Sequence, residues 1–597
     1  MRAYINNKPF DFDEEITILE AARKMGFFIP TLCAFQPLNH TPGTCAVCIV
    51  RVIRADGQEL TLTSCKTPLE DGMHVDTISS AVKKLQRKQV ELLFADHEQD
   101  CVTCGRYGNC ELLQLARNLG VKSAQYTGKF TAKRTVDTSD LAIQLDGNKC
   151  VRCLRCVEVC SQLHGIGALR IDNVGTSAGV CVNQADKWID SNLCVRCGQC
   201  IMVCPTGALM ARDNVEQARE LLEDEEVITV VQFAPAVRAT LGDAFGLLPG
   251  TNVEKRIITG LKMMGANYIL DTNFSADMVI MEEGTELLGR LNDPQAKLPM
   301  FTSCCPAWIN YAEQHIPELL DHISSTRSPQ AVMGSMVKTW FAEKIGQDSS
   351  KIRMISIMPC TAKKVEAARP QLAKDGVPDT DLVLTVRELA RLFQSRGIDL
   401  KTIPDGEFDT PFMSQGTGAA VIFGKSGGVA EAAARTLYHV LTAGEVNSIP
   451  FHAAKNPHAF KEAELELGGK TLRIGVVYGL ANAREVARQV LDGTSSYDFI
   501  EVMTCPGGCV NGGGTFRKRG KYLNFTEQRF EALEKADENC VYRQSHNNPM
   551  VQQAYREFFG EPNSHKAHKL LHTTYDNRKK EPAVPSIREV WQKIKLG

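Results

Sequence analysis

The chain of 597 residues is too long for a single hydrophobic core, so several domains are expected. Its 68 Lys and Arg residues nearly balance 70 Asp and Glu, which argues against a nucleic-acid-binding surface. No apolar run reaches the ~18 residues of a membrane span, and no apolar signal core begins the sequence, so a cytoplasmic location is expected. The 22 cysteines cluster at short spacings, which favours metal ligation over disulfide bonds.

Residues 1–78 are predicted to form a small sheet with one helix over residues 17–25, and Asp56-Gly57 favours a hairpin between two strands. The spacing C-x11-C-x2-C-x16-C resembles the plant-type ferredoxin pattern with a longer first gap. A four-thiolate zinc site is the alternative, although structural zinc usually pairs its ligands two by two. The candidate ligands are Cys33, Cys45, Cys48 and Cys65.

Residues 79–125 open with a predicted helix over residues 81–94, and a cluster of possible metal ligands follows. Their spacing, H-x3-C-x2-C-x5-C, also fits a Cys3His zinc site. The position of this pattern between two iron–sulfur patterns favours a cluster instead. An imidazole in place of a thiolate removes one negative charge, which is one of the factors that set a cluster's potential. The candidate ligands are His97, Cys101, Cys104 and Cys110.

Residues 126–212 contain the strongest local pattern, C-x2-C-x2-C-x3-C, twice. In two-cluster bacterial ferredoxins the fourth cysteine of each run ligates the other cluster. One predicted cluster therefore takes Cys150, Cys153, Cys156 and Cys204, and the other takes Cys194, Cys197, Cys200 and Cys160. The first run is followed by Ser161 where the second has Pro205, and Cys181 lies between the runs without partners.

A charged helix over residues 214–226 is predicted to lead into an α/β region that spans residues 226–597. Several buried strands are expected there, and ligands usually lie at the carboxyl ends of strands in open α/β sheets. The expected strands are residues 227–233, 268–270, 352–357, 472–478 and 499–503. Three cysteine motifs occur in this region: Thr302-Ser303-Cys304-Cys305-Pro306, Met358-Pro359-Cys360 and Cys505-Pro506-Gly507-Gly508-Cys509.

Adjacent side chains point in different directions, so Cys304 and Cys305 cannot easily ligate the same metal atom. One of them can hold a metal while the other faces whatever lies beside it. The motifs together supply four thiolates for one cubane, so Cys304 is not needed as a ligand. Those four thiolates belong to Cys305, Cys360, Cys505 and Cys509.

The three motifs resemble, nearly residue for residue, the signatures of iron-only (FeFe) hydrogenases, and the resemblance covers almost the whole chain. It implies a multidomain α/β protein with a β-grasp 2Fe–2S domain (1–78), a small His/Cys3 4Fe–4S domain (79–125), a two-cluster 4Fe–4S ferredoxin domain (126–212) and a large α/β hydrogenase domain (226–597). The implied cofactors are one 2Fe–2S cluster, three accessory 4Fe–4S clusters and an H-cluster. In the H-cluster, Cys509 links the cubane to a diiron subcluster that carries carbon monoxide, cyanide and a dithiolate.

The resemblance also implies roles for individual residues. Cys304 is the expected acid–base group, and Lys363 the expected donor to a cyanide ligand. Glu283 and Glu286 lie three residues apart, on one face of a predicted helix, and are expected to relay protons. The relay is completed by Ser324 and Arg290. The expected contacts to the diiron subcluster come from Ala234, Pro235, Ser303, Gln330, Met358, Phe423 and Met503.

Simpler alternatives exist for some of these residues. Glu283 and Glu286 can instead belong, with Glu282, to one solvated helix face. Lys363 can be a solvated lysine beside Lys364, and the two methionines can be ordinary core residues. We expect no metal role for Cys540 or for the C-terminal histidines: His565, His568 and His572.

The expected activity is the interconversion of dihydrogen with protons and electrons, which the iron–sulfur clusters relay. Ala236 stands where single-chain, ferredoxin-linked members often have serine, and Ala307 where they usually have glycine. Alanine at both positions is more typical of members that work inside multisubunit complexes. We therefore expect flavin- and NAD(P)-binding and small 2Fe–2S subunits as partners, with electron bifurcation as one mode and ferredoxin as a further electron partner. The alternatives are a single-chain ferredoxin-linked hydrogenase, an electron-transfer subunit without catalysis, and an iron–sulfur assembly or sensing protein.

Overall fold

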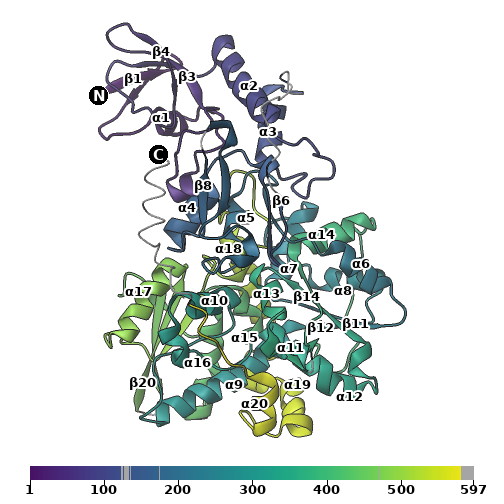
Figure 1. Cartoon of the computed structure of the whole chain (residues 1–597). Coiled ribbons are helices and arrows are strands. Elements are labelled where there is room, and N and C mark those ends of the chain that lie inside the picture. The colour runs from purple at the N-terminus through teal and green to yellow at the C-terminus, as the bar shows by residue number, and fades with distance from the viewer. Residues whose placement is uncertain are drawn as a thin grey trace, which may run out of the picture.

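The computed structural model describes residues 1–122, 126, 134, 136–173, 175–374, 376–467 and 469–579. The N-terminal sheet lies at one end, the cysteine-rich segments follow, and the α/β region forms the other end (Figure 1). In the part of the chain that is described, no helix combines the length and apolar character needed to cross a bilayer.

The N-terminal sheet has the strand order β2-β1-β5-β3-β4. Its helix α1 (Ile18–Lys24) begins at a capping box, in which Thr17 and Glu20 satisfy each other's backbone N–H groups. Gly57 turns the β3–β4 hairpin with a φ of +83°. The predicted helix and hairpin are confirmed. The strands are β1 (Arg2–Ile5), β2 (Lys8–Asp11), β3 (Ile49–Ile53), β4 (Glu59–Thr63) and β5 (His74–Asp76).

The cysteine-rich segments combine helices with two small sheets, of order β10-β7-β6 and β8-β9. The strands are β6 (Val136–Asp137), β7 (Ile143–Asp146), β8 (Leu169–Asp172), β9 (Gly179–Val182) and β10 (Leu209–Ala211). Helices α2 (Ser80–Ala95) and α3 (Glu111–Leu119) pack together, which confirms the helix predicted over 81–94. The two ferredoxin-type runs each end in a short helix, α4 (Arg155–Glu158) and α5 (Gln199–Val203), and these helices also pack together. Equivalent positions in the two runs, Arg152 and Arg196, adopt the left-handed conformation with φ of 53° and 61°. This conformation is uncommon outside glycine, so its repetition reflects the same loop geometry in both runs.

Helix α6 (Val215–Glu223), which confirms the predicted linker helix, leads into two separate sheets. The first sheet is parallel throughout and has the order β12-β11-β14-β17. The second has the order β13-β21-β20-β19-β18, and only its first three strands are parallel. The strands of the first are β11 (Ile228–Phe233), β12 (Tyr268–Asp271), β14 (Ile352–Met358) and β17 (Leu382–Thr385). The strands of the second are β13 (Met300–Phe301), β18 (His452–Ala453), β19 (Lys461–Leu467), β20 (Lys470–Tyr478) and β21 (Phe499–Met503).

All five strands expected in this region are present, and each cysteine motif follows the carboxyl end of a parallel strand. β13 leads to Cys305, β14 to Cys360, and β21 to Cys505. Helix α9 (Thr272–Asn292) packs against α11 (Pro329–Met336) and α16 (Gly428–Thr442) beside these ends. The site therefore draws on both sheets at the edge where open α/β sheets bind their ligands.

Candidate active site and cluster centres

The structure brings the four thiolates expected at the cubane together. Burial raises the pKa of Cys360 to about 12, and repulsion from Cys305 adds to the effect. The pKa values of Cys505 and Cys509 are raised by burial and by the other motif thiolates in the same way. Buried thiolates repel one another unless a cation lies between them, so this group suits an iron cluster.

The loop that carries Cys505 and Cys509 lies directly against the second ferredoxin-type run. Gln199 Nε2 donates a hydrogen bond of 3.0 Å to the Cys505 sulfur. A Cβ at Gly513 would lie 2.6 Å from the carbonyl oxygen of Cys197, so only glycine permits this approach. The contact provides a short route for electrons between the two cysteine groups.

A mainly apolar cavity opens beside these cysteines and is lined by Cys304, Cys509 and Lys363. Ala234, Pro235, Gln330, Met358, Phe423 and Met503, all expected to contact the diiron subcluster, also line it. Ser303, expected among them, is not a lining residue: its hydroxyl donates to the Thr326 carbonyl at 2.5 Å.

Two polar groups in this cavity fit the expected subcluster. The Gln330 Oε1 atom is buried without a hydrogen-bond partner among the described residues, so it can accept a bond from a bound group. Lys363 is 8% exposed, and its ammonium bonds to Glu366 at 2.8 Å and Ser328 at 2.6 Å. The alternative of a solvated lysine is therefore wrong. The Lys363 ammonium suits an anionic ligand on a bound group, and the Gln330 oxygen suits a hydrogen-bond donor on that group.

The expected relay residues lie in sequence from the cavity toward the surface. Glu283 is fully buried, and its pKa is raised to about 8 by burial and by Glu286. Burial and the charge of Glu283 also raise the pKa of Cys304. The Ser324 hydroxyl donates to Glu286 at 2.8 Å, and Arg290 Nη2 donates to the same carboxylate at 2.6 Å. The alternative of one solvated acidic face is wrong, because Glu282 and Glu283 are both 0% exposed.

The two ferredoxin-type cysteine sets also come together across the runs. Cys204 raises the pKa values of Cys150, Cys153 and Cys156, each of which burial raises most. Cys160 acts in the same way on Cys197 and Cys200 in the other set. These interactions agree with the crossover predicted from the spacing, which stays a prediction.

The four candidate cysteines of the first N-terminal group lie together. Cys33 is linked to Cys45 and Cys65, and Cys65 to Cys48, by contacts that shift their pKa values. His97 is a buried imidazole whose pKa falls to about 4, mainly through burial. Its Nδ1 atom has no hydrogen-bond partner among the described residues, as suits a neutral imidazole available as a ligand. In the same group, Cys104 and Cys110 interact electrostatically.

Comparison with known protein families accounts for most of the chain. Residues 227–513 match the iron only hydrogenase large subunit, C-terminal domain, and residues 523–578 match the iron hydrogenase small subunit. The NADP-reducing hydrogenase subunit HndD of Solidesulfovibrio fructosivorans is 39% identical over 589 residues, which cover 96% of this chain and 99% of that protein. The chain belongs to the iron-only hydrogenases.

Further matches extend this iron-only hydrogenase assignment to the N-terminal segments. Residues 1–80 match a 2Fe-2S iron-sulfur cluster binding domain, residues 86–125 the NADH-ubiquinone oxidoreductase-G iron-sulfur binding region, and residues 187–210 a 4Fe-4S binding domain. Iron hydrogenase 1 of Clostridium pasteurianum is 37% identical over 96% of this chain and 99% of its own length. A solved structure of apo FeFe hydrogenase from Chlamydomonas reinhardtii, 38% identical, covers 62% of this chain and 100% of its own with a TM-score of 0.56.

This hydrogenase interconverts dihydrogen with protons and electrons, and its cofactors are an H-cluster with 2Fe–2S and 4Fe–4S clusters. A role limited to electron transfer is thereby excluded. The predicted multidomain α/β fold is confirmed, with ferredoxin-like segments before the hydrogenase domain.

Sequence reasoning missed several residues next to the relay. Ser325 bonds to Glu286, and its hydroxyl lies 2.8 Å from His572 Nδ1. The other nitrogen of His572 lies 3.0 Å from Glu282, which also accepts a hydrogen bond from Tyr555. His572, for which no metal role was expected, is therefore a buried part of the hydrogen-bond network around the relay. No sequence motif predicts this role of His572, because its partners Ser325 and Glu282 are far away in the sequence.

Proposed function

We propose that this hydrogenase works inside a multisubunit complex linked to NAD(P). The proposal rests mainly on the full-length similarity to a subunit of an NADP-reducing hydrogenase. Ala236 and Ala307 support it, and so does the glycine-rich stretch Gly507–Gly514, which a cysteine interrupts and which therefore does not match a nucleotide-binding loop. Nicotinamide reduction would then take place on another polypeptide that binds flavin, with a small 2Fe–2S subunit between them.

Gel filtration and mass analysis of the native protein from its own cells test this proposal. We expect a complex that contains a flavoprotein and couples dihydrogen oxidation to NAD(P) reduction. A monomer that reduces ferredoxin efficiently without other subunits would contradict the proposal and favour the single-chain, ferredoxin-linked alternative.

The chain is further proposed to hold five cluster centres in four domains, 1–78, 79–125, 126–212 and 226–597. The ligands would be the cysteine sets described above, with His97 as the one imidazole. A fully loaded chain should then contain about 20 irons. Anaerobic metal analysis tests the assignment: stoichiometric zinc that is lost in His97→Ala would show that the second domain holds zinc instead of a 4Fe–4S cluster.

At the active site, Cys305, Cys360, Cys505 and Cys509 would hold the cubane, with Cys509 as the link to the diiron subcluster. When bound, the H-cluster supplies the metal and base chemistry that splits or forms dihydrogen. Lys363, oriented by Glu366 and Ser328, would donate to an anionic ligand; such charge-assisted bonds are the strong ones. Infrared bands of iron-bound carbon monoxide and cyanide in the matured protein test this arrangement.

The chain's own residues would move the proton between the cavity and water. Cys304 faces the cavity and exchanges a proton with Glu283. The pKa of the Glu283 carboxyl is about 8, so it is mostly protonated at neutral pH and can pass a proton on. Ser324 bridges to Glu286 by its hydroxyl, and Arg290 holds the Glu286 carboxylate at the outer, partly exposed end. The apolar lining keeps bulk water away from the inner end, so the proton follows these groups.

A further inference from the structure

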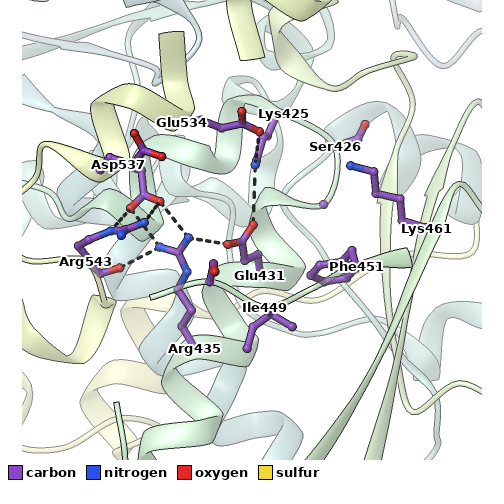
Figure 2. Close-up of a pocket in the computed structure, with 13 residues that line it drawn as sticks. Lys425, Ser426, Glu431, Arg435, Ile449, Phe451, Lys461, Glu534, Asp537 and Arg543 are labelled. Atoms are coloured by element: carbon purple, nitrogen blue, oxygen red, sulfur yellow. Dashed lines mark hydrogen bonds and ion pairs between the residues drawn. The ribbon is translucent and has the colours of Figure 1, made fainter. Parts of the chain in front are cut away.

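The chain usually surrounds a buried arginine with carboxylates. Figure 2 shows Arg435, which is 1% exposed, between Glu431 and Asp537. Its Nη2 atom lies 2.5 Å from Glu431 and 2.9 Å from Asp537. Lys425 in the same pocket pairs with Glu534 at 2.8 Å. Buried positive charge is thus matched by negative side chains, as the cost of desolvating an ion requires.

A second group of buried arginines departs from this pattern. It consists of Arg106, Arg155, Arg387 and Arg517, which are 3%, 2%, 9% and 5% exposed. Arg155 and Arg517 share one carboxylate, Glu111, at 3.0 and 2.7 Å. Within the described part of the chain, no carboxylate pairs with Arg106 or Arg387. Four positive charges therefore face one negative charge, which leaves a net charge of three positive in the interior.

These guanidinium groups converge on Cys204 and its neighbours. The Cys204 carbonyl accepts hydrogen bonds from Arg106 at 3.0 Å and from Arg517 at 3.1 Å. Arg387 Nη2 lies 3.0 Å from the Met202 sulfur, and the Arg387 guanidinium interacts electrostatically with the Cys204 thiolate. Arg155 interacts with the Cys153 and Cys204 thiolates. The uncompensated charge thus surrounds one of the two ferredoxin-type cysteine sets.

Arg387 shows most directly that the described side chains do not supply enough negative charge in this region. Its Nε atom is buried without a partner among the described residues, and Nη1 bonds only to the Gly513 carbonyl at 3.3 Å. An uncompensated charge in the interior costs several kcal/mol. A 4Fe–4S cluster with four thiolate ligands is an anion, and it becomes more negative when it is reduced. Such a cluster would supply the missing charge.

Among the described residues, the other ferredoxin-type set shows no such excess of positive charge. Its buried arginine, Arg196, pairs with the buried carboxylate of Asp140 at 3.0 Å. The two cysteine sets thus share a loop geometry but differ in the charge around them. Since nearby positive charge stabilises the more negative, reduced form, the two clusters should differ in reduction potential.

We propose that Arg106, Arg155, Arg387 and Arg517 raise the reduction potential of the cluster held by Cys150, Cys153, Cys156 and Cys204 above that of its neighbour, so that this cluster stores the electron in the relay. The proposal rests on the ligand sets proposed above. It deepens them by assigning different roles to the two clusters.

The place of this cluster in the fold suits an electron store. A hydrogen bond of 2.8 Å joins His40, from the first domain, to the Cys153 carbonyl. Arg106 comes from the His97 segment, and the neighbouring cluster's loop touches Cys505 through Gln199. The cluster therefore lies where routes from the 2Fe–2S centre, the His97 centre and the active site meet. An electron held there can leave by any of them.

The test compares Arg387→Met with Arg391→Met, a matched control on the same helix, α14 (Val386–Ser395), whose guanidinium is half-exposed and pairs with Asp213. Both chains are loaded with iron and sulfide anaerobically and titrated under electron paramagnetic resonance. Cys156→Ser identifies the signal of the Cys204-containing cluster. In Arg387→Met we expect its reduction to become at least tenfold less favourable, ~59 mV for one electron, with a smaller shift at the neighbour. Arg391→Met should shift neither.

Two further variants separate charge from packing. Arg387→Lys keeps the charge in a different shape and should keep most of the potential, whereas Arg106→Met should lower it as Arg387→Met does. Unchanged potentials in both methionine variants, or equal shifts at the two clusters, would overturn the proposal. Failure to find two ferredoxin-type 4Fe–4S signals in the unmodified chain would overturn the ligand sets themselves, which is a separate result.

Discussion

The two sides of the active site bury different kinds of ionisable group. On the electron side, arginines with too few carboxylates surround a cysteine set. On the proton side, Glu283 is fully buried, and burial raises its pKa to about 8. Glu501 is also fully buried, its charge adds to the rise in the pKa of Glu283, and burial raises its own pKa to about 7. An electron carrier becomes more negative when loaded, so nearby cations stabilise the electron. A proton carrier must gain and lose charge near neutral pH, so a desolvated carboxyl serves it best.

The strongest expected effect is on the proton side, at the adjacent cysteines. Cys304→Ser should lower dihydrogen turnover at least ~10²-fold, because a hydroxyl is a much weaker acid than a thiol of similar size. Every cluster should stay in place, because Cys304 is not one of the proposed ligands. Cys305→Ser should instead lower the iron content of the active site. Iron analysis and dihydrogen evolution, measured on both variants, distinguish the two. Loss of iron from Cys304→Ser would contradict the roles assigned to this pair.

Glu283→Gln should also lower turnover, by ~10²-fold, because an amide cannot carry the proton onward. The neighbouring Glu282 is equally buried but bonds to Tyr555 and His572, so Glu282→Gln is a matched control. We expect it to destabilise the C-terminal segment and to keep most of the turnover. Equal losses of turnover in the two variants at equal iron content would show that the relay does not pass through Glu283 alone.

On the electron side, Glu111→Gln should act in the direction opposite to Arg387→Met. It removes the one carboxylate that Arg155 and Arg517 share, so the cluster's potential should rise. Breaking a buried ion pair also costs ~3–5 kcal/mol of stability, which a lower unfolding temperature should show. A lower potential in Glu111→Gln would mean that charge does not explain the difference between the two clusters.

The smallest effect on turnover is expected at the His97 centre. His97→Ala should lose up to about four irons and leave the other clusters intact, because its ligand set is separate. Turnover with an artificial electron donor should stay within a few-fold, since electrons can still enter through the other centres. A loss of all clusters would show that this segment is needed for folding of the whole chain.

The sequence alone was enough to propose the ligand sets. A motif such as C-x2-C-x2-C holds three cysteines within one loop, so most ligands of each ferredoxin-type cluster are near one another in the chain. The fourth ligand of each, and the cubane set, join distant segments and were proposed from the resemblance to known motifs. Glu283 and Glu286 are also near one another in the chain, because three residues is less than one helical turn. The individual strands were predictable too, since each is a continuous apolar run.

Only the tertiary structure showed that these strands form two sheets, that His572 lies beside the relay, and that Arg387 faces Cys204 without a carboxylate. Each of these features joins segments that are far apart in the sequence, and no local pattern encodes such contacts. The charge balance of the interior has the same origin: it depends on which side chains are buried together. By composition the chain is nearly neutral. Its fold nevertheless buries a group of arginines beside the electron relay and a group of carboxyls beside the proton relay. The difference matters because an uncompensated charge is costly once it is removed from water.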